Sequence, residues 1–235
     1  MRTKFITATV ALAAAALAQN AHAGLVFSIE GPQVEASTVP GVTTENFDSF
    51  TPGSYSSLTT AVGTFDGGEI VAANEYGGAG GTNYWAVGAE SNTHSQTLTL
   101  TSAQDYLGLW WSAGDASNIL TFFDGATVIG TYNVAEIIPS LSSAYFGNPS
   151  DSFANDSQPY DYLNFTTTGS TVITSVEFTA TTFTAGFEVD NISVLPTPIT
   201  PPGQVVPETS STFALLLAVA GLFAVSRRHR QATCA

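Results

Sequence analysis

The clearest strand pattern in this chain is Phe183-Thr184-Ala185-Gly186-Phe187-Glu188-Val189-Asp190-Asn191-Ile192-Ser193-Val194. From 183 to 189 the odd-numbered residues are apolar, and Thr184, Gly186 and Glu188 stand between them. A period of two residues is typical of an antiparallel strand with one face in the core and one face in solvent. We therefore predict a strand whose odd-numbered residues, Phe183 included, face inward and whose Glu188 faces outward.

The alternation changes phase after Val189, because Ile192 and Val194 continue the apolar face in place of residues 191 and 193. One extra residue at Asp190-Asn191 would restore the register, so the sequence predicts a β-bulge there. A bulge would turn these two side chains toward a rim where oxygen ligands can converge.

Similar patterns recur along the chain. In 171–179, Val172, Val176 and Phe178 share one face with Thr174. Further strands are expected at 25–29, 44–50, 61–65, 69–73, 96–101, 106–111, 118–123, 127–132 and 161–166, and Asp124-Gly125 is a hairpin signal between two of them. Many short strands separated by turn residues predict an all-β fold, an antiparallel β-sandwich of jelly-roll type, over residues 24–195.

Three segments between the strands have distinct compositions. Gly77–Gly81 is expected to be a flexible connection, and the polar loop 148–159 is long enough to be functional. Residues 196–206 are rich in proline, so we expect an extended linker that holds the domain away from the segment after it.

Charge is distributed very unevenly along the chain. All five basic residues lie at the two ends, whereas eighteen of the nineteen acidic residues lie in 24–206, which has no Lys or Arg. The domain is therefore a polyanion that repels nucleic acid, anionic lipid and acidic polysaccharide, and salt should stabilise it by screening. Solubility or a saline habitat would explain such acidity equally well.

The first 23 residues have the organisation of a signal peptide. Arg2 and Lys4 precede an apolar run, and Ala21-His22-Ala23 has the small-x-small pattern that signal peptidase cleaves. We expect export through the Sec machinery and a mature chain that begins at Gly24. The alternative is a permanent N-terminal anchor, for which the apolar run is short.

The C-terminal segment 207–230 has three parts. Val206-Pro207-Glu208 precedes an apolar run at 213–225, and Arg227, Arg228 and Arg230 follow as a basic membrane stop. This order resembles the PEP-CTERM sorting signal of Gram-negative bacteria, with Thr209 where a second proline is common. The resemblance implies an exosortase substrate, transiently anchored in the inner membrane by a transmembrane helix and then released to the cell surface or an exopolysaccharide matrix. The alternative is a simple C-terminal membrane anchor.

Most catalytic chemistry is poorly supported. The only cysteine is Cys234, and His94 is the only histidine of the mature domain, so thiolate chemistry and a tetrahedral zinc site are excluded there. A glycoside hydrolase needs only two carboxylates, but eighteen acidic residues make some pair inevitable. We therefore expect no enzymatic activity and no certain cofactor, and an unassigned glycoside hydrolase is the less favoured alternative.

Calcium is the cofactor that these residues could bind. Oxygen-bearing side chains gather near strand ends at Asp115 and Asn118, and again at Glu188, Asp190 and Asn191. Calcium prefers such carboxylate and amide oxygens, although no EF-hand spacing is present. The alternative is that these groups are solvated turn residues.

Aromatic side chains could bind a sugar by stacking. The candidates are Tyr84, Trp85, Trp110 and Trp111, and strand alternation sends the last two to opposite faces. One of them should be in the core and the other exposed as a glycan platform. The alternative for each ring is core packing.

The stretches 106–124 and 186–194 also resemble the carbohydrate-module-like sandwich domains that often carry this sorting tail. The leading hypothesis is an exported, non-enzymatic protein with a structural or interaction role in extracellular polymer. The alternative is a lectin-like module that binds a neutral extracellular polysaccharide, with or without calcium.

Overall fold

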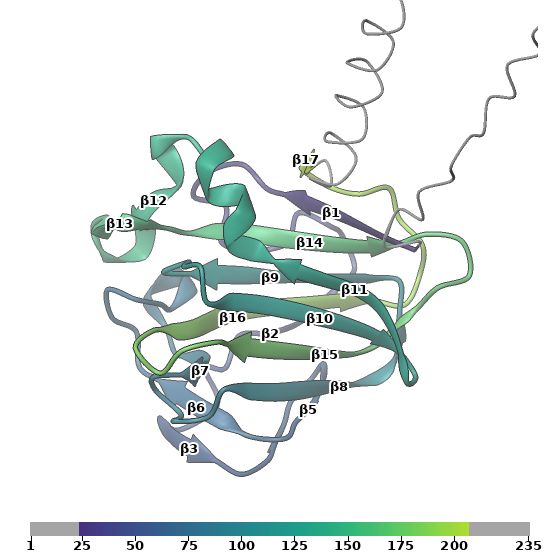
Figure 1. Ribbon diagram of the computed structural model, residues 1–235, viewed down its shortest axis with the longest axis horizontal. Coiled ribbons are helices and arrows are strands. Elements are labelled where there is room, and N and C mark those ends of the chain that lie inside the picture. The colour runs from purple at the N-terminus through teal and green to yellow at the C-terminus, as the bar shows by residue number, and fades with distance from the viewer. Residues whose placement is uncertain (1–23, 207–235) are drawn as a thin grey trace, which may run out of the picture. The chain divides into compact units, whose positions relative to one another are not determined.

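The computed structural model describes residues 24–206. The predicted signal peptide, 1–23, and the sorting segment, 207–230, lie outside these residues. The described part is built almost entirely from antiparallel strands, arranged as two facing sheets (Figure 1). An all-β sandwich is therefore confirmed.

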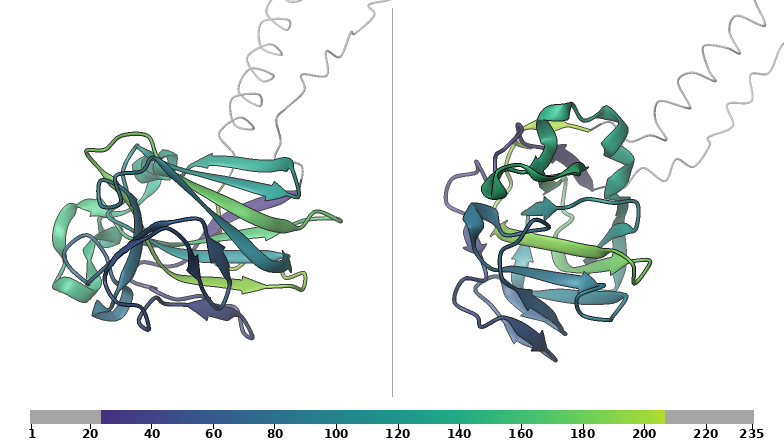
Figure 2. Two further views of the ribbon diagram at one scale, coloured as in Figure 1. Left: turned by 90° about the horizontal axis from the view of Figure 1, so that it is seen from below. Right: turned by 90° about the vertical axis from the view of Figure 1, so that its left-hand side faces the viewer.

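The larger sheet has nine strands and the smaller sheet has six. In spatial order the larger sheet contains β17 (Gln204–Val205), β1 (Leu25–Ile29), β14 (Asp161–Thr167), β9 (Tyr106–Ser112), β16 (Gly186–Leu195), β7 (Tyr84–Gly88), β6 (Gly68–Val71) and β3 (Gly53–Tyr55), with β2 (Thr43–Glu45) beside β16. The smaller sheet contains β11 (Thr127–Asn133), β10 (Asn118–Asp124), β15 (Ile173–Ala180), β8 (Ser95–Gln104), β5 (Gly63–Phe65) and β4 (Leu58–Thr59). Figure 2 shows the two layers from the side.

Short elements cover one end of the sandwich. They are β12 (Phe146–Asn148) and β13 (Ala154–Pro159), which pair with each other, and the 3₁₀ turns η1 (Ala79–Gly81), η2 (Val134–Ser140), η3 (Ser143–Tyr145) and η4 (Pro149–Asp151). No helix within 24–206 is both long and apolar enough to cross a membrane.

The core between the sheets is rich in aromatic rings. Trp85 lies 4.7 Å from Phe65 and 5.2 Å from Phe178, measured between ring centroids. Farther along, Phe165 lies 4.9 Å from Phe27 and 4.4 Å from Phe122. Such pairs add to the free energy of burial, so the interior carries the stability that salt bridges to Lys or Arg cannot supply in 24–206.

The bulge predicted in β16 is confirmed. Phe187, Val189, Ile192 and Val194 are all buried, and the register against β9 shifts between residues 190 and 193. Asn191 has a φ of 45°, in the left-handed region that an extra bulge residue can adopt. The bulge keeps one apolar face continuous along the whole strand.

The hairpin signal is also confirmed, because Asp124-Gly125 joins β10 to β11 and Gly125 has a φ of 58°. The face predicted for 171–179 is correct at Val176 and Phe178. It is wrong at Val172, because a register shift between residues 173 and 175 puts Ile173 in the core instead.

The prediction that Phe183 faces inward is wrong. This residue is 48% exposed, and its ring stacks on His94 with the centroids 3.7 Å apart. The strand begins only at Gly186, so residues 181–185 are outside the sheet and alternation does not determine their direction.

The central strands of the larger sheet are buried on both faces, which alternation did not predict. Every residue of β9 and β14 is buried. A second apolar cluster lies on the outer face, made of Ala79, Trp110, Ala113, Tyr160 and Tyr162. Glu188, expected to face solvent, is only 3% exposed because the loops over this face cover it.

The segment 196–206, predicted to be an extended linker, ends in a short strand of the larger sheet. Ser28 and Ile29 of β1 pair with β17, and the backbone N–H of Val206 donates to the carbonyl of Phe27 at 3.0 Å. Val206 packs partly buried against the core. This end of the segment is therefore an edge strand of the larger sheet.

Candidate functional site

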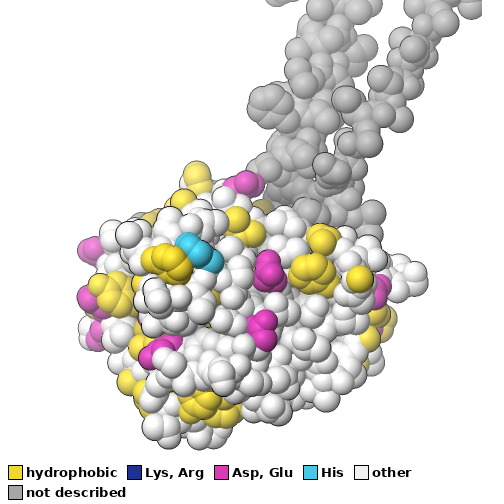
Figure 3. Space-filling view, turned by 60° about the horizontal axis from the view of Figure 1, so that its bottom comes forward, with side chains coloured by type: hydrophobic (Ala, Val, Ile, Leu, Met, Phe, Trp, Pro, Cys, Tyr) yellow, Lys and Arg dark blue, Asp and Glu magenta, His cyan; other side chains and the backbone are white. Residues whose placement is uncertain are grey.

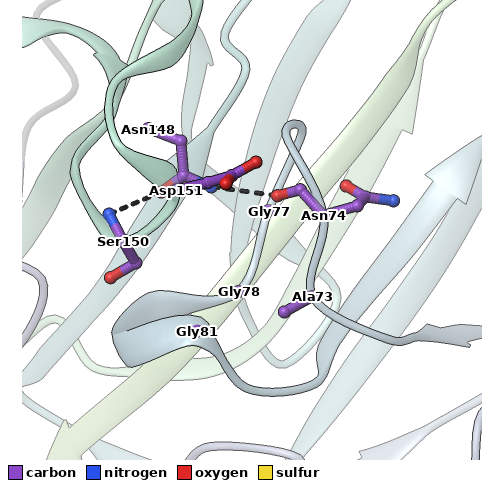
Figure 4. Close-up of a pocket in the computed structure, with 8 residues that line it drawn as sticks. All are labelled: Ala73, Asn74, Gly77, Gly78, Gly81, Asn148, Ser150 and Asp151. Carbon is purple, nitrogen blue, oxygen red and sulfur yellow. Dashed lines mark hydrogen bonds between the residues drawn. The ribbon is translucent and has the colours of Figure 1, made fainter.

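The structure brings two of the loops noted in the sequence together over the outer face of the larger sheet. A pocket of about 210 Å³ lies between the glycine-rich loop after β6 and the loop that contains η4 (Figure 4). Its lining residues are Ala73, Asn74, Gly77, Gly78, Gly81, Asn148, Ser150 and Asp151. Four of these residues carry polar side chains, Asn74, Asn148, Ser150 and Asp151, and they stand beside three glycines and Ala73.

Asn148 joins the two walls of this pocket. Its Nδ2 donates to the carbonyl of Asn74 at 3.1 Å, and its Oδ1 accepts the backbone N–H of Ser150 at 2.9 Å (Figure 4). Gly78 has a φ of 100°, and a Cβ there would overlap the carbonyl of Thr82. The wall on that side therefore requires glycine.

Glu35 binds the same two loops from outside the pocket. One carboxylate oxygen accepts the backbone N–H of Gly80 at 3.0 Å, and the other accepts the hydroxyl of Ser150 at 2.7 Å. Gly77–Gly81 was expected to be a flexible connection, and in the structure the bond from Glu35 holds its Gly80.

Asp190 and Asn191 at the bulge hold these loops to the sheet. The carboxyl group of Asp190 accepts the N–H of Ala79 at 2.8 Å and that of Asn191 at 2.6 Å, and Asn191 Nδ2 donates to the carbonyl of Glu35 at 2.8 Å. Burial raises the pKa of Asp190 to about 8. The side chains of Asp190 and Asn191 therefore already hydrogen-bond to other parts of the protein.

The remaining predicted calcium ligands do not converge with these two. Asn118 is buried, its Oδ1 accepts Trp111 Nε1 at 2.8 Å, and its Nδ2 donates to the carbonyl of Gly186 at 2.8 Å. Asp115 accepts the N–H of Ser117 at 2.6 Å in a local turn. The two groups of candidate ligands are therefore engaged in separate hydrogen bonds within the protein. Within 24–206, no three His, Cys, Asp or Glu side chains form a metal-binding group.

Glu188 instead lies beside Glu90, a residue that the sequence reasoning missed. A Cβ built on Gly186 would overlap both Glu188 Oε1 and Glu90 Oε2, so the two carboxyl groups flank the same glycine. Burial raises the pKa of Glu188 well above its usual value, and the charges of Glu90 and Asp115 raise it further. Burial also raises the pKa of Glu90. Glu90 follows β7 in a turn with no strand pattern, so nothing in the sequence singled it out.

The four rings proposed for sugar stacking are all buried. Trp85, Trp110 and Trp111 are 0% exposed and Tyr84 is 1% exposed. Trp110 and Trp111 do lie on opposite faces, but the second apolar cluster covers Trp110. The expectation of an exposed tryptophan platform is therefore wrong.

The large rings that do reach solvent come from loops. Tyr76 is 43% exposed and Phe153 is 46% exposed, and each is within two residues of a residue that lines the pocket. In the sequence, only their positions near Gly77 and Asp151 could have pointed to these two rings. Periodicity does not show which way a side chain in a loop points.

The surface of the described domain carries acidic groups without Lys or Arg. Figure 3 shows Asp and Glu side chains scattered over one face, and His94 is the only histidine in 24–206. An anionic ligand would meet unfavourable potential everywhere on this surface.

Comparisons with known proteins give no assignment. No family model matches the chain, and no curated protein is significantly similar to it. Of the residues predicted to direct processing and membrane insertion, only Val206 is described. Ala21, Ala23, Pro207, Glu208, Arg227, Arg228 and Arg230 lie outside 24–206.

Proposed function

We propose that this chain is an exported exosortase substrate of a Gram-negative bacterium, with a non-enzymatic structural or interaction role in extracellular polymer. The terminal segments deliver the domain to the cell surface or matrix, and residues 24–206 carry the role there. We further propose that the sandwich is of the jelly-roll type, as in carbohydrate-binding modules.

The pairing of the first and last strands of the domain carries this proposal. β1 pairs with β17, and the backbone N–H of Val206 donates to the carbonyl of Phe27, so β17 is the edge strand of the larger sheet. The described domain therefore ends in its own sheet directly before the predicted sorting segment, which supports processing near Pro207-Glu208.

Deletion of residues 207–235 tests this proposal in the native bacterium. We expect the full chain to reach the cell surface or matrix, and the deletion variant to be exported but found in a different fraction. A variant with Arg227, Arg228 and Arg230 changed to glutamine should be mislocalised too, and Glu177→Gln is the matched control. Identical fractionation of all four chains would contradict the proposal.

A second candidate function is the binding of a neutral glycan in the pocket between the two loops. The observation that favours it is a mixed lining, in which Asn74, Asn148 and Asp151 offer hydrogen-bonding groups beside apolar glycine and alanine surface, as the two faces of a neutral sugar require. A volume of about 210 Å³ is below the range typical of drug-sized ligands, so the pocket suits one sugar residue or a chain end. The acidic surface disfavours charged sugars.

A glycan array with Asp151→Ala tests this second function. Asp151 is exposed and lines the pocket, so its removal should abolish binding while leaving the fold intact. Asp156→Ala, also exposed but outside the pocket lining, is the matched control. Equal binding by both variants would exclude the pocket, and loss with EDTA would show a need for calcium. Mass spectrometry of the recovered glycan separates binding from hydrolysis.

A further inference from the structure

Three buried side-chain oxygens without a hydrogen-bond partner come from three different elements at one end of the larger sheet. They are Glu188 Oε2 on β16, Ser112 Oγ on β9 and Glu90 Oε2 in the turn after β7. Buried polar atoms normally have partners, so three such atoms in one place require an explanation, which is either a proton shared between the two carboxyl groups or a bound ion.

The register of the strands brings these atoms together. Glu188 is the direct partner of Ser112 across the β9–β16 pair, and paired residues project from the same face. Gly186 on β16 pairs with Gly88, two residues before Glu90. The overlap that a Cβ at Gly186 would make with both carboxyl groups shows that Glu90 reaches back over this position.

A hydrogen bond from Asn118 holds the backbone of Gly186, beside which the two carboxyl groups lie. Asn118 Nδ2 donates to the carbonyl of Gly186 at 2.8 Å, and Asn118 Oδ1 accepts Trp111 Nε1 at 2.8 Å. Because Gly186 has no side chain, the two carboxyl groups can approach its backbone. Glu188 itself is 3% exposed.

The negative charge of the Glu90 and Glu188 carboxyl groups determines which ligand can bind between them. Glu188 is buried and Glu90 is half-buried, and two neighbouring carboxyl groups in such surroundings do not both stay ionised without a positive partner. Residues 24–206 contain no Lys or Arg, and His94 hydrogen-bonds through Nδ1 to the carbonyl of Ala180. The compensating charge must therefore be a proton or a cation from solution.

We propose that Glu90, Glu188 and Ser112 form a binding site for one divalent cation, and that calcium is its ligand. The two carboxylates supply the charge, the serine hydroxyl supplies a neutral oxygen, and water completes the coordination. Calcium accepts six to eight oxygens in flexible geometry, whereas magnesium demands a near-ideal octahedron and gives up its water reluctantly, so calcium is the better match for side chains from two strands and a turn. This inference is independent of the proposed function.

Isothermal titration of the full chain with CaCl₂, in metal-free buffer at pH 7.5, tests the proposal. We expect one ion per chain and release of protons, because calcium displaces the proton that the pair otherwise shares. Thermal unfolding should show a rise in the midpoint with CaCl₂ that exceeds the rise with NaCl of equal ionic strength.

Matched variants assign the binding to these residues. Glu188→Gln and Glu90→Gln should each weaken calcium binding at least tenfold, and Ser112→Ala should weaken it less. Glu177→Gln on β15, in the other sheet, should bind as the wild type does. In calcium-free buffer Glu188→Gln should unfold at or above the wild-type temperature, because it removes one charge of the pair, so lost binding would not reflect misfolding.

The proposal is overturned if wild-type chain shows no saturable binding, or if CaCl₂ and NaCl raise the midpoint equally. It is also overturned if all the variants bind calcium alike, since that result would assign binding to dispersed surface carboxylates.

Discussion

The backbone N–H of Ala79 donates to Oδ2 of Asp190 at 2.8 Å and so ties the glycine-rich loop to the bulged strand β16. The two residues are 111 positions apart in the chain. The bulge that the sequence predicted therefore fixes a wall of the pocket, and it does so through a side chain expected to be a metal ligand.

The first prediction concerns the effect of pH on stability. Burial raises the pKa of Asp190 to about 8, and burial also raises the pKa of Glu188, Asp161 and Glu90. The folded state then binds more protons than the unfolded state between about pH 4 and pH 8, so stability should fall as pH rises through this range. Thermal unfolding at pH 5 and pH 8.5 in the absence of calcium measures the difference.

Asp190→Asn should reduce this dependence, because one of the groups that takes up a proton is gone. Asp156→Asn, at an exposed carboxyl group, should leave the dependence unchanged. A wild-type domain that becomes more stable from pH 5 to pH 8.5 would refute the assignment of these buried carboxyl groups as protonated.

A second prediction concerns the edge strand β17. Gly203 has a φ of 65°, and a Cβ there would overlap the carbonyl of Ile29. Gly203→Ala should therefore release residues 203–206 from β1 and speed their hydrogen exchange, measured by mass spectrometry of C-terminal peptides. Gly169→Ala is the matched control, since Gly169 has a φ of 68° but no atom within 4 Å of its Cβ position. Unchanged exchange at 203–206 in Gly203→Ala would mean that β17 does not depend on this contact.

A third prediction separates core rings from surface rings. Trp85 is 0% exposed between Phe65 and Phe178, so Trp85→Ala should cost about 3–5 kcal/mol of unfolding free energy. Phe183 is 48% exposed and contacts His94, so Phe183→Ala should change stability by about 0.5 kcal/mol or less. Urea denaturation gives both values, and similar costs for the two variants would contradict the packing described.

The local strand pattern gave the fold class, the bulge at Asp190-Asn191 and the hairpin at Asp124-Gly125. It failed at the outer face of the larger sheet, where Glu188 and Trp110 are buried. Alternation separates two faces of a strand, but it does not say which faces loops will cover. That coverage depends on contacts such as Asp190 with Ala79, which join residues far apart in the chain.

The candidate sites were harder to predict than the fold, because they too depend on contacts between residues far apart in the chain. Asn118 and Asp115 have suitable oxygens, but local hydrogen bonds already occupy them. Glu90 has no motif around it, and only the pairing of β7 with β16 brings it to Glu188. The segment 196–206 was expected to be a linker from its prolines, yet two of its residues pair with β1.

A fourth prediction follows from the absence of Lys and Arg in 24–206. Self-repulsion among carboxylates weakens with screening, so the unfolding midpoint at pH 7.5 should rise as NaCl increases from about 0.05 M to about 1 M. Stabilising salt bridges would give the opposite trend. A midpoint that falls with NaCl would contradict the electrostatic account.

The intact mass of the protein recovered from the cell surface or matrix tests the central claim most directly. We predict a chain that begins at Gly24 and ends near Pro207-Glu208, so that only the β-sandwich and its edge strand remain. A product that retains Met1 or still ends at Ala235 would contradict the claim that both ends are removed after they have directed the domain outside the cell.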